Sequence, residues 1–228
     1  MSIKVEVPGG KYIIENEKKF YPAYGKRLFD LALTIPAVIV LSPILMIAAL
    51  LVRVRLGSPV LFEQERPGLK EKVFVVYKFR TMTNALDNDG ELLPDVQRIT
   101  RFGTFLRKAS IDELPELFNV LKGDMSLVGP RPLLVKYLPY YTSRERLRHS
   151  VRPGLTGLAQ ISGRNYLPWD ERLGMDVRYV ENMSLWLDVK IILQTFLQVM
   201  KAKNVTPLPG TACNYLSDDR EKQKQTNP

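Results

Sequence analysis

The chain has 228 residues, with 33 Lys and Arg against 24 Asp and Glu, and a formal net charge of +9 at pH 7. Its length suits one domain with its own hydrophobic core, and its charge favours an anionic partner: nucleic acid, anionic lipid or a phosphorylated substrate. The single cysteine, Cys213, excludes an internal disulfide and favours a reducing compartment, and the single histidine, His149, excludes a Cys/His metal cluster.

Residues 1–25 form a short polar arm, with a turn expected at Pro8-Gly9-Gly10. The most apolar stretch follows. Residues 28–52 hold one formal charge, Asp30, and would form a helix about 37 Å long, enough to cross a hydrocarbon core of roughly 30 Å. The stretch is too long for a signal-peptide core and lacks a small-residue cleavage pattern, so we expect it in the mature protein.

Basic residues flank this segment on both sides, with Lys26 and Arg27 before it and Arg53 and Arg55 after it. Cationic flanks prefer the cytoplasmic side of a membrane. A spanning helix must send one basic end across, whereas a re-entrant segment at residues 26–55 keeps both ends on one side. Both interpretations remain open at this point, because kinked prolines also occur in spanning helices.

The pair Ser42-Pro43 interrupts the middle of the segment. Pro43 has no N–H, so the carbonyl of Ile39 loses its helical donor. The Ser42 hydroxyl can donate back to the carbonyl of Ile39 or Val38 and offset that loss. Pro36 is expected to add a second bend. Ser42 and Pro43 therefore predict a kink, which would be the break of the helix if the segment is re-entrant.

Residues 59–82 contain two β-rich runs, at residues 60–62 and Val73–Phe79, separated by a turn at Arg66-Pro67-Gly68. This pattern predicts a small hairpin. Residues 84–95 read as an exposed acidic loop, and Arg101–Lys108 as a helix.

Residues 110–124 carry apolar side chains at helical spacing and a terminating Gly123, which predicts one strong helix. Two stretches rich in Gly, Pro and Arg, at residues 126–134 and 151–165, are expected to be loops. Residues 167–183 and 184–203 are predicted helices. The second has an apolar face that packs in the core or, given Trp186 and Phe196, at a membrane surface. From residue 207 to 228 no core pattern remains, and disorder is expected.

Asp112 and Glu113 form the sharpest candidate site. If the helix begins at Ser110, Ser-x-x-Glu forms a capping box, and if it begins at Asp112, Pro115 lies in the first turn. Either start places both carboxylates at a helix N-terminus, where anions, including phosphate, are favoured. The alternative is an ordinary acidic N-terminus without a catalytic role.

Cations in conformationally restricted loops surround this pair in the sequence. Such arginines suit bidentate phosphate binding, and with no usable His or Cys they point to phosphoryl chemistry on a diphosphate. A carboxylate is then the candidate nucleophile, and a hard divalent cation, of which Mg²⁺ suits such a site best, would bridge carboxylate and phosphate. A Ser-His-Asp site would need His149, which lies in the charged run RERLRHS, typical of a solvated helix face. The candidate phosphate-binding residues are Lys78, Arg80, Arg107, Arg131, Arg152 and Arg164.

The succession KRLFD, LSP, RPGL, YKFRTM, LRKASIDELPELFNVLKGDMSLVGPRPLL and VRPGLTGLAQISGRN resembles the bacterial sugar transferase family. These are monotopic polyprenyl-phosphate phosphoglycosyl transferases, and the chain is similar to their small members. The resemblance covers residues 26–204. It implies a mostly helical α/β fold with a re-entrant membrane helix, interfacial helices, a small β-hairpin and long ordered loops.

The resemblance also implies an activity. The enzyme would transfer a sugar-1-phosphate from a UDP-sugar to undecaprenyl phosphate, with release of UMP, in a first membrane step of glycoconjugate synthesis. By analogy, Asp112 is the nucleophile and Glu113 completes a dyad that helps to hold Mg²⁺. The catalytic domain would occupy residues 56–206, on the cytoplasmic face of the bacterial inner membrane in contact with phospholipid. The sequence indicates neither the sugar, the prenyl length nor an oligomeric state.

Two other hypotheses are weaker. A non-enzymatic membrane adaptor that binds anionic lipid or an acidic protein would need no nucleophile at Asp112. Nucleic-acid binding is not expected, because the basic residues are scattered through Pro/Gly loops without a recognition helix or an RNA-binding pattern.

Overall fold

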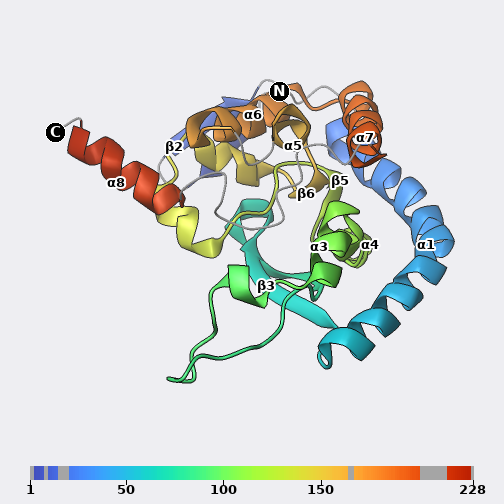
Figure 1. The fold of residues 1–228 in the computed structure, drawn as a ribbon. Coiled ribbons are helices and arrows are strands. Elements are labelled where there is room, and N and C mark those ends of the chain that lie inside the picture. Colours follow the sequence, from blue (N-terminus) through green and yellow to red (C-terminus); the bar gives the residue numbers. More distant parts are fainter. Residues whose placement is uncertain (1–2, 8–9, 15–20, 164–166, 201–214, 227–228) are drawn as a thin grey trace.

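The computed structural model describes residues 3–7, 10–14, 21–163, 167–200 and 215–226. These residues form a mostly helical fold, as expected, with three two-stranded sheets where one hairpin was predicted (Figure 1). The N-terminal arm contains the antiparallel strands β1 (Ile3–Val7) and β2 (Gly10–Ile14), and Pro8 and Gly9 of the expected turn lie outside the described residues. A short π-helical turn at Tyr21–Gly25 leads into the apolar segment.

Helix α1 (Lys26–Leu56) is a single continuous helix that contains both Pro36 and Pro43. The Ser42 hydroxyl donates to the Ile39 carbonyl at 2.8 Å, which confirms the predicted compensation for the missing N–H of Pro43. Figure 1 shows α1 bending as it follows one side of the molecule. We attribute the bend to the prolines, which each remove a helical hydrogen bond.

Only one stripe of α1 packs against the protein. Leu45, Ala48 and Val52 recur at helical spacing and pack in a core cluster with Phe79 and Leu106. The outer side is apolar and exposed along most of its length. Among the described residues, α1 is the one helix long and apolar enough to cross a membrane. Its large exposed side chains are Leu28, Leu33, Ile35, Ile39, Val40, Ile44, Met46, Ile47, Leu50, Leu51 and Val54.

The predicted hairpin is present as β3 (Leu61–Pro67) and β4 (Val73–Phe79), which pair antiparallel with Leu61 opposite Phe79. The turn lies slightly later than predicted, around the 3-10 segment Leu69–Glu71. The acidic loop is exposed and ends in α2 (Asp95–Arg98). Helix α3 (Arg101–Lys108) is confirmed, with the Thr100 hydroxyl accepting from Gly103 N–H at its N-cap.

The single helix predicted over residues 110–124 is wrong in its first part. Ser110 adopts a left-handed conformation with φ 55°, and a 3-10 turn at Ile111–Glu113 precedes α4 (Glu116–Lys122). The capping box is not formed, since the left-handed Ser110 makes no side-chain cap. Pro115 occupies the N-cap of α4, where its missing N–H is no cost, and Gly123 ends the helix at φ 92° as predicted.

The two stretches predicted as loops contain regular structure. Strand β5 (Ser126–Val128) pairs in parallel with β6 (Gly154–Thr156), and α5 (Leu158–Ser162) follows. Strands of three residues are too short for the sequence pattern to reveal them. Helices α6 (Trp169–Asn182) and α7 (Leu185–Met200) are confirmed. The exposed side chains of α7 include Trp186, Phe196 and Met200.

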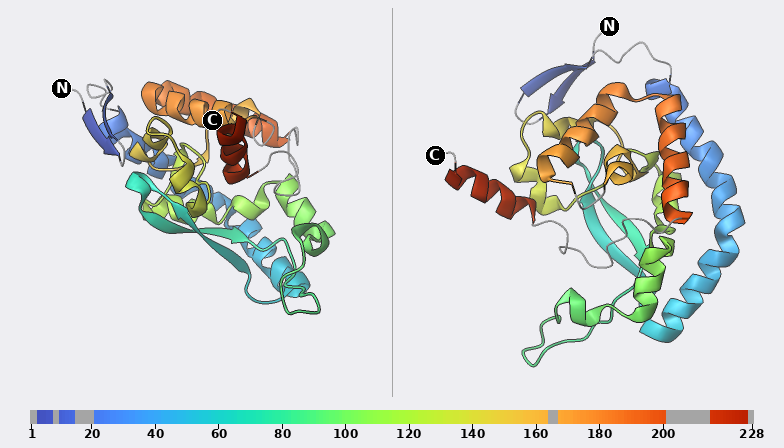
Figure 2. Two further views of the ribbon diagram at one scale, coloured as in Figure 1. Left: turned by 90° about the vertical axis from the view of Figure 1, so that its left-hand side faces the viewer. Right: turned by 45° about the horizontal axis from the view of Figure 1, so that its top comes forward.

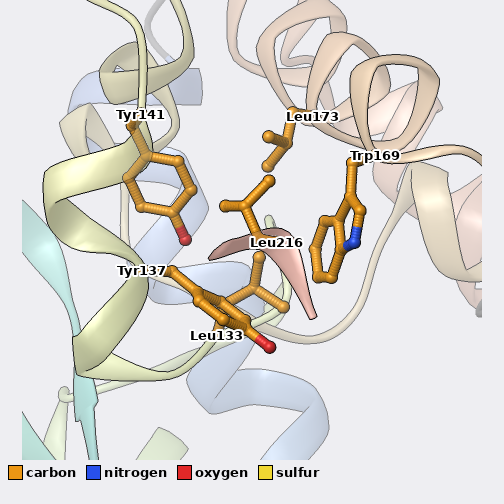
Figure 3. Packing of buried hydrophobic residues seen from close by; sticks show 6 residues of the cluster. All are labelled: Leu133, Tyr137, Tyr141, Trp169, Leu173 and Leu216. Atoms are coloured by element: carbon orange, nitrogen blue, oxygen red, sulfur yellow. The ribbon is translucent and has the colours of Figure 1, made fainter. Parts of the chain in front are cut away.

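The expectation of disorder over residues 207–228 is wrong for α8 (Leu216–Thr226). Leu216 is fully buried at the centre of a cluster with Leu133, Tyr137, Tyr141, Trp169 and Leu173 (Figure 3). Arg220 forms ion pairs with Glu145 and Asp170. One apolar anchor and a few charges are too weak a pattern to recognise in a polar sequence. Helix α8 lies on the side of the molecule opposite α1, as Figure 1 and the right-hand view of Figure 2 show.

Candidate active site

The candidate dyad lies in the 3-10 turn between α3 and α4, next to the end of β4. Gly103 lets α3 approach the segment that follows β4 closely, because a Cβ at this position would lie 1.8 Å from the Thr81 carbonyl oxygen. Arg107 in the last turn of α3 donates through Nε to the Thr81 hydroxyl at 3.0 Å. The left-handed Ser110 then turns the chain, so that Asp112 and Glu113 face the same region as Arg107 and Lys78.

Asp112 is buried, with 9% of the residue exposed. Burial, followed by the negative charge of Glu113, raises its pKa to about 6, although the charges of Lys78, Arg107 and Arg131 act in the opposite direction. A carboxylate with this pKa is still largely ionised at neutral pH, and it is more basic than an exposed aspartate. A carboxyl that is buried among cations and has a raised pKa is typical of a reactive group, not of a surface charge.

Glu113 has the opposite electrostatic environment. Its Oε1 accepts from Lys78 Nζ at 2.7 Å and from Arg131 Nη2. Partial burial opposes its ionisation, but these two cations dominate and lower its pKa well below the ordinary value. The negative charge of Glu113 in turn raises the pKa of Arg131. The neighbouring carboxyls therefore differ: Glu113 is a permanently ionised anchor for two cations, and Asp112 titrates in the range of cellular pH.

Two residues that the sequence analysis did not single out also belong to the site. Glu116, 2% exposed, lies 3.0 Å from Lys78 Nζ, so Lys78 bridges two carboxylates. Arg66 donates to the Pro132 carbonyl at 3.3 Å, and burial together with the charge of Arg131 lowers its pKa to about 10. The spacing of Glu116 from Asp112, four residues along a helical pattern, was a signal for a shared face.

Three of the predicted phosphate-binding residues lie elsewhere or cannot be placed. Arg80 is buried and donates to the Pro59 carbonyl at 2.8 Å, where it lines a separate cavity of about 320 Å³. Arg152 donates to the Gly123 carbonyl at 2.8 Å, at the far end of α4 from the dyad. Arg164 lies outside the described residues. Strand and loop positions in the sequence do not show to which side these long side chains turn.

His149 was predicted on a solvated helix face, and this is wrong. It is 4% exposed in the 3-10 segment Glu145–Ser150, and its Nδ1 lies 3.3 Å from the Gly68 carbonyl oxygen. Burial lowers its pKa to about 3, so it stays neutral. Its role is packing against the hairpin turn. The charged run misled the prediction because Leu147, Arg148 and His149 all turn inward.

Asp112 and Glu113 are the candidate ligands for a metal ion. In the part of the chain that the structure describes, no group of three or more His, Cys, Asp or Glu side chains is arranged to hold a metal. Two carboxylates beside several cations are compatible with Mg²⁺, which usually binds proteins through one or two carboxylates and completes its shell with water and substrate phosphates.

Residues 21–202 match the family model of the bacterial sugar transferases. The chain is 52% identical over 180 residues to an uncharacterised sugar transferase, EpsL, of Bacillus subtilis, a match covering 79% of this chain and 89% of the relative. It is 40% identical over 194 residues to a UDP-glucose:undecaprenyl-phosphate glucose-1-phosphate transferase of Caulobacter vibrioides, covering 78% and 71%. It is 42% identical over 206 residues to an undecaprenyl-phosphate galactose phosphotransferase of Salmonella typhimurium, covering 83% and 43%, so it spans less than half of that protein.

Proposed function

Because the chain belongs to the bacterial sugar transferase family, we propose that it transfers a sugar-1-phosphate from a UDP-sugar to undecaprenyl phosphate and releases UMP. The observation that carries this proposal is the buried Asp112 with its raised pKa, within the electrostatic reach of Lys78, Arg107 and Arg131. A nucleophilic carboxylate surrounded by cations suits a reaction in which both substrates are phosphates.

In the first step, a carboxylate oxygen of Asp112 attacks the phosphorus nearer the sugar. The bond from that phosphorus to the bridging oxygen breaks, UMP leaves with the electron pair, and a phosphosugar-aspartate remains. Arg107 and Arg131 face the charge that accumulates on the phosphate oxygens, where fixed cations stabilise the transition state most effectively. Neither step requires a histidine, which agrees with the neutral, buried His149.

In the second step, a phosphate oxygen of undecaprenyl phosphate attacks the same phosphorus and releases the Asp112 carboxylate. Glu113 keeps Lys78 and Arg131 in place through both steps, since it contacts both. We propose that Asp112 and Glu113 hold Mg²⁺, which when bound supplies charge neutralisation for the diphosphate.

We also propose that α1 enters the membrane from the cytoplasmic side and returns to it, so that the protein is monotopic. Arg27 near its start donates to the carbonyls of Val120 and Leu121 on α4, at 2.6 and 2.9 Å. Near its end, Arg55 lies 5.2 Å from the ring centroid of Phe102 on α3. One end of α1 thus contacts α4 and the other contacts α3, the two helices that flank the dyad. These contacts support the location of both ends on one side of the membrane.

The reaction is tested by UMP release from a panel of UDP-sugars with undecaprenyl phosphate and Mg²⁺. We expect UMP release with at least one UDP-sugar. Release of more than one UMP per protein should require the lipid acceptor. A chain that binds membranes but releases no UMP with any sugar would support the adaptor hypothesis instead.

The pH dependence of UMP release follows from Asp112. We expect kcat/KM to rise as pH increases through about 6, because the protonated carboxyl is not a nucleophile and its folded-state pKa lies there. In Glu113→Gln the rise should move to lower pH, since Glu113 raises the Asp112 pKa. Rate profiles of both proteins test this, and a wild-type rise near the ordinary aspartate value of about 4 would contradict it.

The topology has a separate test in a Cys213→Ser background. Single cysteines at Tyr24 and Ser58, which are exposed on either side of α1, should both react with an impermeant thiol reagent only from the cytoplasmic side. A cysteine at exposed Lys108 in the catalytic domain marks that side. Labelling of Tyr24→Cys and Ser58→Cys from opposite sides would show that α1 spans the membrane.

A further inference from the structure

We propose that Arg148 is a positioning residue for the phosphate-binding Arg131: it fixes the main chain of the Arg131 loop and thereby places the guanidinium against Glu113. The phosphate-binding role of Arg131 rests on the proposed function. The contact between Arg148 and the Arg131 carbonyl does not depend on it. Arg148 makes no contact with the dyad in the described structure, so it would act only through Arg131.

The loop Gly129-Pro130-Arg131-Pro132 is held at every carbonyl from 130 to 132. The Pro130 carbonyl accepts from Gly154 N–H at 2.9 Å, the Arg131 carbonyl from Arg148 Nη2 at 2.6 Å, and the Pro132 carbonyl from Arg66 Nη1 at 3.3 Å. The two prolines also restrict φ on either side of Arg131. A loop fixed in this way has little freedom to relocate its side chain.

Gly154 shows how tightly this loop is packed. A Cβ added at Gly154 would lie 2.0 Å from the Gly129 nitrogen, so only glycine permits the approach of β6 to the loop. The loop is therefore held by the main chain of β6 and by two arginine side chains. Of these three supports, Arg148 alone contacts the carbonyl of Arg131 itself.

The Arg148 side chain is 1% exposed and all of its nitrogens have partners. Nε and Nη2 donate to one carboxylate oxygen of Asp176 on α6, at 3.1 and 2.8 Å, and Nη1 donates to the Tyr141 hydroxyl at 3.2 Å. The planar guanidinium can serve three partners in fixed directions, which a lysine could not do. Asp176 and Tyr141 thus aim the remaining Nη2 hydrogen at the loop.

Tyr141 links this support to the rest of the fold. Its ring packs in the cluster around Leu216 and Leu133, and Leu133 is the second residue after Arg131 (Figure 3). The position of the phosphate-binding arginine therefore depends on a buried network that extends from α6 to the loop. A short loop next to a reactive carboxylate gains from such support, because small displacements of a catalytic group cost large factors in rate.

The variant that tests this is Arg148→Met with Asp176→Leu, which removes the charge pair together and avoids leaving a buried carboxylate unpaired. In single-turnover experiments, we expect the rate of phosphosugar adduct formation to fall by about 100-fold, while the amount of adduct finally formed stays close to one per protein. A purely structural role would instead lower the final amount and leave the rate of the folded fraction unchanged.

A double-mutant cycle shows whether Arg148 acts through Arg131. In an Arg131→Met background, the paired substitution should lower the adduct rate by less than about 3-fold, since the guanidinium it positions is already gone. If the paired substitution lowers the adduct rate by the same factor in the Arg131→Met background as in the wild type, the proposal is overturned.

The matched control is Arg146→Met with Glu71→Leu. Arg146 lies in the same 3-10 segment, pairs with Glu71 at 2.6 Å and donates to the Leu138 carbonyl at 2.8 Å, so it has the same kind of contacts away from Arg131. We expect a change in rate of less than about 3-fold.

A readout independent of activity separates this inference from the proposed function. The Nε–H NMR signal of Arg131, assigned by its loss in Arg131→Met, should shift in Arg148→Met/Asp176→Leu and stay in place in the control. An unshifted signal would overturn the positioning role. Absence of UMP release and adduct in the wild type would contradict the proposed function, and the NMR result would then decide the inference alone.

Discussion

Asp112→Asn should lower UMP release by about 10⁴-fold or more and abolish the covalent adduct, because an amide oxygen cannot replace the attacking carboxylate. The side chains are nearly isosteric. The substitution also removes the repulsion between two neighbouring carboxyls, since the Glu113 charge acts unfavourably on ionised Asp112. We therefore expect the variant to fold, and the loss to appear in the rate and not in the yield of protein.

Asp124→Asn is the control for Asp112→Asn. Asp124 follows the end of α4 and faces Lys122 at 3.6 Å in a largely exposed pair. It should retain the wild-type rate of UMP release. If Asp112→Asn also retains that rate, another residue is the nucleophile, and Glu116 and Glu113 are then the nearest alternatives.

Asp188→Ala should lower the free energy of unfolding by about 1.5–3 kcal/mol, because buried donors lose a charged acceptor while Lys26 keeps its pair with Asp30 at 2.8 Å. Asp188 in the first turn of α7 is fully buried and lies 2.9 Å from Lys26 Nζ at the start of α1. Its other oxygen accepts from the Tyr179 hydroxyl at 2.8 Å, and the Tyr21 hydroxyl donates to the same oxygen as Lys26.

Denaturant unfolding in detergent micelles measures this effect. Asp124→Ala, which removes one half of the exposed pair with Lys122, should change the free energy by less than about 1 kcal/mol. Asp188 joins α7 to the first turn of α1. Its loss should therefore also increase hydrogen exchange of the backbone amides in the first turn of both helices. A change in Asp188→Ala as small as that of the control would show that the network does not hold the two helices together.

The sequence pattern was sufficient for the elements that have their own periodicity or their own breakers. The apolar α1, strand β4, α3, α6 and α7 were predicted close to their bounds, whereas β3 continues through Pro67 into residues predicted as the turn. The hydrogen bond from the Ser42 hydroxyl to the Ile39 carbonyl could be predicted, because Ser42 is adjacent to Pro43 and the bond joins residues of the same helical turn. Glu113, Lys78 and Arg131 were predicted as one site and lie in contact.

The failures share a physical cause, which is that they depend on contacts between distant segments. Arg80 and Arg152 are long side chains in the expected kinds of position, but each turns to a carbonyl away from the dyad. His149 is buried by the hairpin turn, and α8 is held by the docking of Leu216. The 3-10 turn at the dyad depends on the left-handed Ser110, for which a single serine gives no sequence signal.

The most direct test of the mechanism is the intact mass of the wild-type protein after incubation with its UDP-sugar and Mg²⁺, without the lipid acceptor. Nucleophilic attack by Asp112 predicts an added mass of one sugar phosphate, equal in amount to the UMP released, absent in Asp112→Asn and lost when undecaprenyl phosphate is added. UMP release that begins only when the acceptor is present, with no mass added to the protein at any time, would contradict it.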